Sequence, residues 1–404
     1  MSKSMDGTKE MTLQQDAESP LGVSDGKVTV PAPQPTPWWI WVILLISVIG
    51  VSSAGPMFAE LGNVPPLLRA SWRLQTTSLL LLFPAFVVQW FLHTDEPMRR
   101  KCFEMKTIGI ILMSAIMIAG HFGAWVCSIE MTALTHSLLF VTAHPVVVAI
   151  GMIVLHRVPF KECFGLDIQI RSPNALEICG TLLAFGGAGI SFMDEGSKQS
   201  EDGHAVTVEG DFVAFLGAVF FVGYMICGRV LRSWMPIFIY AFPVTLLGGM
   251  FLVPLSYAFE HRAEGMGLLW GYYDLRYFWW FLIMSFIAGI LGHTGFNMCL
   301  QYLSSLVVST SLVFEPIVGT LIAYILFKVD VPGTFTYIGG SLLLIGILAV
   351  IIGSEEEKEI ESKEEIPTTD PDSNENIEID TDSKEVRAGK SGFTALSIAD
   401  RDIV

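Results

Sequence analysis

Long apolar runs recur along this chain, and each is long enough to cross a lipid bilayer. A helix of around 20 apolar residues spans the roughly 30 Å hydrocarbon core of a membrane. Between Thr107 and His156 the chain has no lysine or arginine and only one acid, Glu130, yet it holds two such runs. The same pattern predicts ten transmembrane helices, at residues 38–57, 71–92, 107–127, 133–155, 175–193, 211–231, 236–258, 277–300, 306–327 and 333–353.

Composition fits an all-α integral membrane protein. The mean hydropathy is +0.54, and only 16% of the residues are charged. The net charge of −16 would suggest a basic partner, but sixteen acids and six bases lie in residues 354–404 alone. Because that segment and residues 1–37 have few large apolar side chains, we expect both to be disordered. Nothing in this distribution indicates nucleic-acid binding.

Basic residues indicate the orientation of the chain in the membrane. Cytosolic segments of membrane proteins are enriched in lysine and arginine. With the N-terminus in the cytosol, twelve basic residues flank the spans on the cytosolic side and five on the other. This asymmetry predicts that both termini are cytosolic and that residues 194–210 form a polar loop on the opposite side, in either the plasma membrane or an endomembrane.

The two halves of the chain resemble each other. At an offset of 170 residues Pro66 and Pro84 fall on Pro236 and Pro254, and at 171 Pro145 falls on Pro316. At an offset of 172 the matched residues are Gly120, His121, Gly123, Cys127 and Ser137 with Gly292, His293, Gly295, Cys299 and Ser309. We interpret residues 38–193 and 211–353 as two copies of a five-helix unit. Since five is odd, the copies are expected to be inverted, as in many secondary transporters.

Three segments also resemble a known family: GHFGAWVCSIEMTALTHSLLFVTAHPVVVAI, GHTGFNMCLQYLSSLVVSTSLVFEPIVGTLIAYILF and YIGGSLLLIGILAVI. They are similar to the paired signatures of the drug/metabolite transporter superfamily, in its EamA-like branch. The resemblance covers residues 38–353. It implies ten helices around a central cavity and a substrate such as an amino acid, amine, purine or drug. Many members have an acid after the fourth and ninth spans, whereas this chain has His156-Arg157 after the fourth.

Glu315 lies near the middle of the ninth predicted span, directly before Pro316. A charge at the bilayer centre costs about 2.5–3.5 kcal/mol on insertion scales, so it should face the bundle interior or a wet cavity. It is either a substrate or proton site or a support for the helix kink that Pro316 introduces. His144 and Pro145 hold the equivalent positions in the first copy, where His144 is either a titrating group or a neutral core histidine.

Other polar residues share helix faces. His293, Asn297 and Gln301 recur every four residues, and so do His121 and Trp125. We expect them to line the cavity, with Trp125 as an aromatic wall, although such stripes also join helices by hydrogen bonds.

Arg69 and Arg73 share a face at the start of the second span. Such arginines usually extend toward the membrane interface, and the alternative is a gate that attracts anions. No other lysine or arginine lies deep in a predicted span, which argues against a substrate that carries a phosphate group.

The sequence therefore predicts a secondary transporter that moves a small organic metabolite by alternating access. Proton coupling is compatible with this prediction. A nucleotide-sugar or organic-phosphate exchanger is the alternative within the same superfamily. A receptor or scaffold that signals through the acidic tail is the alternative from another class. No Walker loop, nucleophile motif or metal-ligand spacing is present, so neither enzymatic activity, a cofactor nor a metal is expected. The last residues, Asp402-Ile403-Val404, weakly resemble a ligand of PDZ-type domains.

Overall fold

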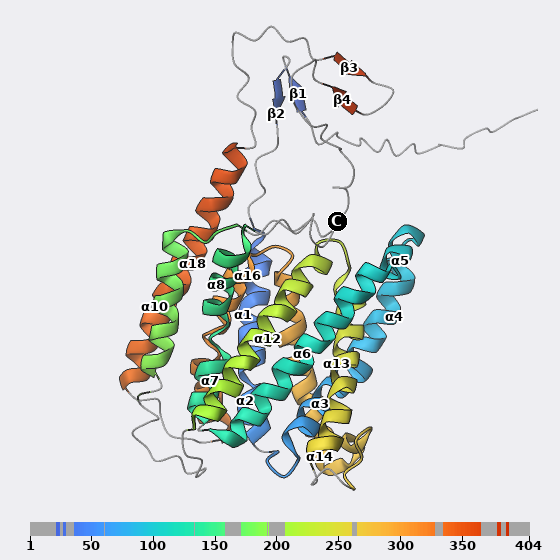
Figure 1. The fold of residues 1–404 in the computed structure, drawn as a ribbon, viewed down its shortest axis with the longest axis vertical. Coiled ribbons are helices and arrows are strands. Elements are labelled where there is room, and N and C mark those ends of the chain that lie inside the picture. The colour runs from blue at the N-terminus through green and yellow to red at the C-terminus, as the bar shows by residue number, and fades with distance from the viewer. Residues whose placement is uncertain are drawn as a thin grey trace, which may run out of the picture. The chain divides into compact units, whose positions relative to one another are not determined.

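The computed structural model describes most of the segment between Gln34 and Lys358 and a few residues outside it (Figure 1). The described residues are 22–24, 27–29, 36–59, 61–132, 134–157, 171–191, 193, 207–260, 265–327, 334–364, 378–380 and 385–387. Most of the predicted loop 194–210 and the chain's last residues lie outside these ranges. The second position where family members carry an acid, here Lys328-Val329-Asp330, lies outside them too.

Eight helical stretches in the described residues are long and apolar enough to cross a membrane. They are Trp38–Phe58, Pro66–Leu92, Met105–Met131, Ser137–Leu155, Val208–Arg232, Ile237–Phe259, Leu275–Cys299 and Tyr337–Glu355. Shorter apolar helices occupy the predicted fifth and ninth spans, at Ala175–Ile190 and Ser305–Gly319. An all-α membrane protein is thus confirmed.

Helix breaks and π-helical turns interrupt several of these stretches. The first half contains α1 (Trp38–Ser52), α2 (Ala54–Ala59), α3 (Pro66–Thr76), the π-helix η1 (Thr77–Leu82), α4 (Phe83–Leu92), α5 (Glu96–Cys102), α6 (Met105–Met131), α7 (Leu134–Val141), α8 (His144–Leu155) and α10 (Ala175–Ser191). The second half contains α12 (Val208–Arg232), α13 (Ile237–Phe259), the 3₁₀ helix η3 (Gly271–Tyr273), α14 (Leu275–Met284), the π-helix η4 (Ser285–Thr294), α15 (Gly295–Cys299), α16 (Ser305–Leu312), α17 (Glu315–Phe327) and α18 (Thr334–Glu364).

The two prolines predicted to kink helices instead stand where new helices begin. Helix α7 ends at Val141, and α8 begins at His144, so Pro145 is its second residue. In the same way α17 begins at Glu315, three residues after α16 ends at Leu312. Proline suits the first turn of a helix because the missing N–H has no partner there anyway. Each predicted kink is therefore a full break, and it places His144 and Glu315 at helix N-termini.

The helices pack in a pattern that joins the two halves of the chain. Helix α6 packs against α12 and α13, and η4 packs against α1 and α3. Helices α3 and α13 contact each other, as do α8 and α16. Helices α10 and α18 approach closely at pairs of glycines, because a Cβ on Gly187 would lie 2.6 Å from the carbonyl oxygen of Gly339.

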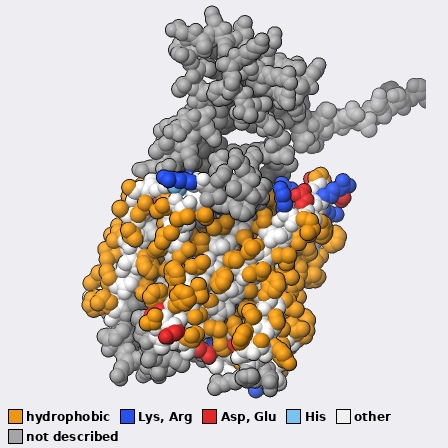
Figure 2. All heavy atoms as spheres, viewed as in Figure 1, with side chains coloured by type: hydrophobic (Ala, Val, Ile, Leu, Met, Phe, Trp, Pro, Cys, Tyr) orange, Lys and Arg blue, Asp and Glu red, His pale blue; other side chains and the backbone are white. Residues whose placement is uncertain are grey.

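The outer surface of the helices is apolar. Figure 2 shows hydrophobic side chains over most of the visible face, with lysine and arginine gathered at the end where α5 lies. Exposed side chains include Leu45, Val88, Phe91 and Ile325. Such a surface suits contact with lipid tails rather than water.

Outside this helical unit the structure describes two short antiparallel hairpins. Strand β1 (Gly22–Ser24) pairs with β2 (Lys27–Thr29), and β3 (Glu378–Asp380) pairs with β4 (Glu385–Arg387). Helix α18 also continues to Glu364, past the predicted end of the last span at residue 353. The expected disorder of residues 1–37 and 354–404 stays a prediction.

Candidate functional site

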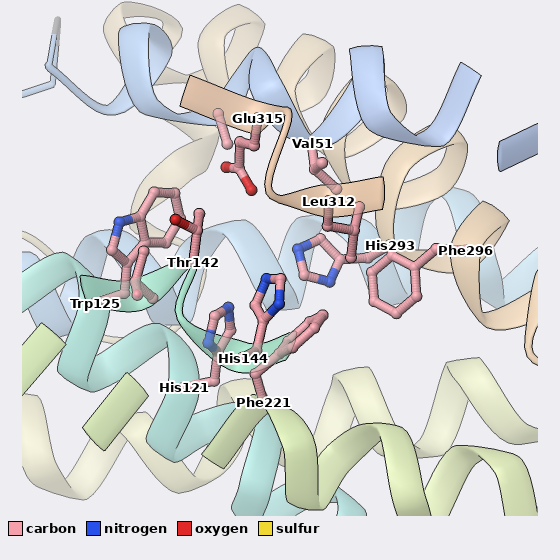
Figure 3. A pocket seen from close by; sticks show the side chains of 12 residues that line it. Val51, His121, Trp125, Thr142, His144, Phe221, His293, Phe296, Leu312 and Glu315 are labelled. Atoms are coloured by element: carbon pink, nitrogen blue, oxygen red, sulfur yellow. The ribbon is translucent and has the colours of Figure 1, made fainter. Parts of the chain in front are cut away.

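A small cavity lies between the two halves of the chain (Figure 3). Its walls come from the ends of α1 and α2, from α6, α12 and η4, and from the two helix breaks. The lining residues are Val51, Ala54, His121, Trp125, Val141, Thr142, His144, Phe221, His293, Phe296, Leu312 and Glu315. Its free volume of about 20 Å³ holds roughly one water molecule, so an organic metabolite does not fit in this conformation.

The helix breaks place two predicted site residues in the cavity. His144 and Glu315 are the first residues of α8 and α17, where backbone N–H groups lack helical partners. This end of a helix carries partial positive charge and favours an anion such as the Glu315 carboxylate. In Figure 3 that carboxylate points into the cavity, across from the imidazoles.

Three imidazoles occupy the opposite side of the cavity among aromatic rings. His121 Nδ1 lies 3.0 Å from the carbonyl oxygen of Gly217, and since a carbonyl can only accept, Nδ1 carries the hydrogen. The His121 ring also stacks on Trp125, with centroids 6.2 Å apart. The centroids of His121 and His293 are 6.2 Å apart, and that of His144 lies 4.8 Å from Phe221.

The polar stripe predicted on the eighth span does not share one environment. His293 lines the cavity, but Asn297 donates hydrogen bonds to Tyr224 Oη, at 2.6 Å, and to the carbonyl of His293. Gln301 lies beyond the end of α15 and accepts a hydrogen bond from Arg232, at 2.8 Å. The prediction of one shared face assumed a regular α-helix. Helix η4 instead has i→i+5 hydrogen bonding, which changes which residues lie on the same face.

Both arginines of α3 are buried inside the protein, so their predicted extension toward the membrane interface is wrong. Arg69 is 2% exposed and Arg73 is 1% exposed. Arg69 donates to the carbonyl of Phe58, at 2.9 Å, and forms an ion pair with Glu130. The prediction failed because the helix begins at Pro66 rather than residue 71, which brings both arginines within the packed bundle.

Several cavity residues were not predicted from sequence. Val51, Val141, Phe221 and Leu312 are ordinary apolar residues of apolar helices, so composition alone does not mark them. The repeat does carry a signal. At the offset of 170 Val51 falls on Phe221, and at 171 Val141 falls on Leu312.

The donor set favours binding rather than metal chemistry. Among the described residues no group of three or more His, Cys, Asp and Glu side chains is placed to hold a metal ion. What the cavity offers is one carboxylate, three imidazoles and aromatic walls. This combination can bind and orient a polar organic molecule and can carry a proton.

Comparison with known proteins supports the resemblance stated from the sequence. Residues 208–352 match the EamA-like transporter family. A 49-residue segment is 49% identical to the permease-like protein YdzE of Bacillus subtilis (strain 168), a match that covers 12% of this chain and 59% of that protein. One crystal structure shares the fold, with a TM-score of 0.56 and 11% identity over 78% of this chain and 99% of the other.

These matches confirm the resemblance to the drug/metabolite transporter superfamily. The family match covers residues 208–352 of this chain, and the chain spans only 59% of the length of YdzE.

Proposed function

Because residues 208–352 carry an EamA-like transporter domain, we propose that this protein is a secondary carrier for a small organic metabolite. Ten membrane-spanning helices form two inverted five-helix repeats, residues 38–193 and 211–353. The cavity between the repeats is the substrate site, and rocking of one repeat against the other opens it to each side of the membrane in turn.

The observation that carries this proposal is the composition of the cavity wall. Its lining contains residues that are equivalent in the two repeats. The pairs are Val51 with Phe221, His121 with His293, Val141 with Leu312, and His144 with Glu315. Paired positions meet around one cavity when the cavity lies on the axis that relates the repeats. Inverted-repeat transporters place their substrates at such a position.

Helix contacts support the same arrangement. The contact of α6 with α12 has its counterpart in that of η4 with α1, and the contact of α6 with α13 in that of η4 with α3. The pair α3 with α13 joins equivalent helices directly, and α8 and α16 belong to the equivalent fourth and ninth predicted spans. A pseudo-twofold axis through the cavity accounts for all of these contacts.

The small cavity fits a closed state of such a carrier. A site with room for roughly one water molecule must enlarge before it admits a metabolite. The breaks before His144 and Glu315 separate short helices that can shift without bending a continuous helix. We propose that movement at these breaks enlarges the site.

The orientation follows from the basic residues. The twelve-to-five asymmetry supports cytosolic termini. Helix α5, which has Arg99, Arg100 and Lys101 in its last turn, lies at the end of the bundle where basic side chains gather (Figures 1 and 2). That end is the cytosolic one in this proposal. A receptor or scaffold remains the alternative, but a repeat built around a cavity has no evident use in signalling.

Transport by the purified full-length protein in liposomes tests the proposal. Vesicles with the protein and protein-free vesicles are incubated in a metabolite extract, and their contents are compared by untargeted mass spectrometry. We expect a small set of organic solutes to enter only the vesicles that contain protein. Two substitutions on α1 provide the structural control: Val51→Phe fills the cavity, while Val42→Phe adds the same bulk at a side chain that is 43% exposed. Val51→Phe should abolish uptake and Val42→Phe should preserve it. Equal uptake by both variants would place the pathway elsewhere.

A further inference from the structure

Arg73 lies in the interior of the membrane bundle, on α3. Its backbone is held in place: the hydroxyls of Thr77 and Ser285 donate to its carbonyl oxygen, at 2.8 and 3.3 Å. Its side chain is 1% exposed. None of its three guanidinium nitrogens has a hydrogen-bond partner in the part of the protein that the structure describes.

Other buried arginines of the protein do have such partners. Arg69 donates to the carbonyl of Phe58, and Arg232, which is 4% exposed, donates to the carbonyl of Met235 and, at 2.8 Å, to Gln301. An arginine has five N–H donors, and leaving them unsatisfied in an apolar interior destabilises the fold. All three guanidinium nitrogens of Arg73 are without a partner, whereas Arg69 and Arg232 each leave only Nε without one among the described residues. Such a cost is typical of a group retained to bind a ligand.

One aromatic ring separates the Arg73 guanidinium from the cavity. The guanidinium carbon lies 4.2 Å from the ring centroid of Phe122, in a cation–π contact. Phe122 also contacts His121 and His293, whose ring centroids are 4.9 and 5.0 Å away and which line the cavity. Phe122 therefore lies between the guanidinium and the imidazoles that line the cavity.

Glu315 supplies the opposite charge. It interacts electrostatically with Arg73 from the other repeat, but it does not accept a hydrogen bond from the guanidinium. The N–H donors of the planar Arg73 guanidinium are thus available to another acceptor. A carboxylate can accept two parallel hydrogen bonds from such a guanidinium.

We propose that Arg73 is the anion-binding residue of the transport cavity and that the cargo carries a carboxylate, which pairs with this guanidinium when Phe122 swings aside. This inference rests on the proposed transport function. The charges on Arg73 and Glu315 balance, so a singly charged carboxylate suits the site better than a phosphate dianion. An amino acid would satisfy both groups, with its ammonium toward Glu315, whereas a simple carboxylic acid would satisfy Arg73 alone.

Thermal stability distinguishes a binding role from a structural one. Arg73→Gln removes no hydrogen bond formed within the described residues, so the melting temperature of the purified full-length protein should fall less than in a variant of a hydrogen-bonded buried arginine. Arg232→Gln, the matched control at a side chain that is 4% exposed, removes the hydrogen bonds to Met235 and Gln301 and should lower it clearly. A drop with Arg73→Gln as large as that of Arg232→Gln would assign Arg73 a structural role and overturn the proposal.

Uptake into proteoliposomes tests the substrate class. Radiolabelled pyruvate, succinate, alanine and glutamate are compared with glucose 6-phosphate, adenine and putrescine, for the wild type, Arg73→Gln and Arg73→Lys. We expect wild-type uptake of at least one carboxylate, a loss of tenfold or more in Arg73→Gln, and partial retention in Arg73→Lys. Uptake of alanine and glutamate alone would identify an amino-acid carrier, and uptake of pyruvate or succinate a carrier of simple carboxylates.

Two other outcomes overturn the assignment. Uptake of adenine, putrescine or glucose 6-phosphate but of no carboxylate would refute the substrate class and leave the transport function standing. Carboxylate uptake that is unchanged in Arg73→Gln would refute the role of Arg73. If the wild type moved none of these solutes and nothing from a metabolite extract, the proposed function itself would fail.

Discussion

Two adjacent glycines in α10 should respond in opposite ways to the same substitution. A Cβ added to Gly187 would lie 2.6 Å from the carbonyl oxygen of Gly339 and 2.7 Å from the amide nitrogen of Leu343, both in α18. A Cβ added to Gly186 would meet no atom within 4 Å. The first glycine allows the helices to approach each other, and the second faces away from the contact.

The size of each effect follows from these distances. To reach the 3.4 Å of ordinary contact, the α18 backbone would have to withdraw from an alanine at Gly187 by about 0.8 Å. Overpacking of this kind costs about 1–3 kcal/mol, and the gain in helix propensity from glycine to alanine offsets up to about 1 kcal/mol of it. Gly186→Ala gains the same helix propensity without any overpacking. We expect Gly187→Ala to lower the free energy of unfolding by about 1–2 kcal/mol and Gly186→Ala to raise it by up to about 1 kcal/mol.

Thermal unfolding of the detergent-purified protein measures the difference. At roughly 2 °C per kcal/mol for a chain of this size, the melting temperatures of the two variants should differ by about 2–6 °C. Size-exclusion chromatography before the scan shows whether both are folded. Equal melting temperatures, or a lower value for Gly186→Ala, would refute the close approach of α10 and α18.

Three further predictions concern coupling, the acidic tail and topology. If Glu315 exchanges protons during transport, Glu315→Gln should stay folded and lose the pH dependence of uptake in proteoliposomes, whereas a purely structural Glu315 would give a less stable protein with an unchanged pH profile. Deleting residues 360–404 should leave uptake per folded molecule nearly unchanged, because the segment lies outside both repeats; loss of uptake by a folded truncated protein would mean that the tail is a gate. Cysteines placed at Ser200 and Ser373 should be labelled from opposite sides of the membrane, and labelling from one side would refute the inverted repeat.

Apolar periodicity predicted the helical class because the bilayer imposes one length on every spanning helix. It did not predict where the helices break. Pro145 and Pro316 marked the positions, but a proline is compatible with both a kink and a new helix. The difference matters for function, since only a full break puts His144 and Glu315 at helix N-termini.

The fate of polar side chains was harder to predict, because it depends on packing between distant segments. Asn297 was expected in the cavity, but its amide donates to Tyr224, 73 residues earlier in the chain. Arg69 pairs with Glu130, 61 residues away. Sequence spacing gives the face of a regular helix, but it does not give the partner that the face meets. It also fails where a helix is not regular, as in η4.

The charges of the cavity do not follow the symmetry of its walls. The position equivalent to Arg73, at the offset of 170, holds Pro243, and the one equivalent to Glu315 holds His144. Pairs of lining residues such as Val51 with Phe221 thus come from both proposed repeats, while the cation comes from the first and the carboxylate from the second. In the proposed rocking mechanism, a symmetric scaffold allows the states open to either side of the membrane to be similar in energy. Under the same proposal, opposite charges at non-equivalent positions would bind a polar cargo in one orientation throughout the cycle. Loss of the cation should for this reason impair binding of the cargo without disturbing the rocking motion of the scaffold.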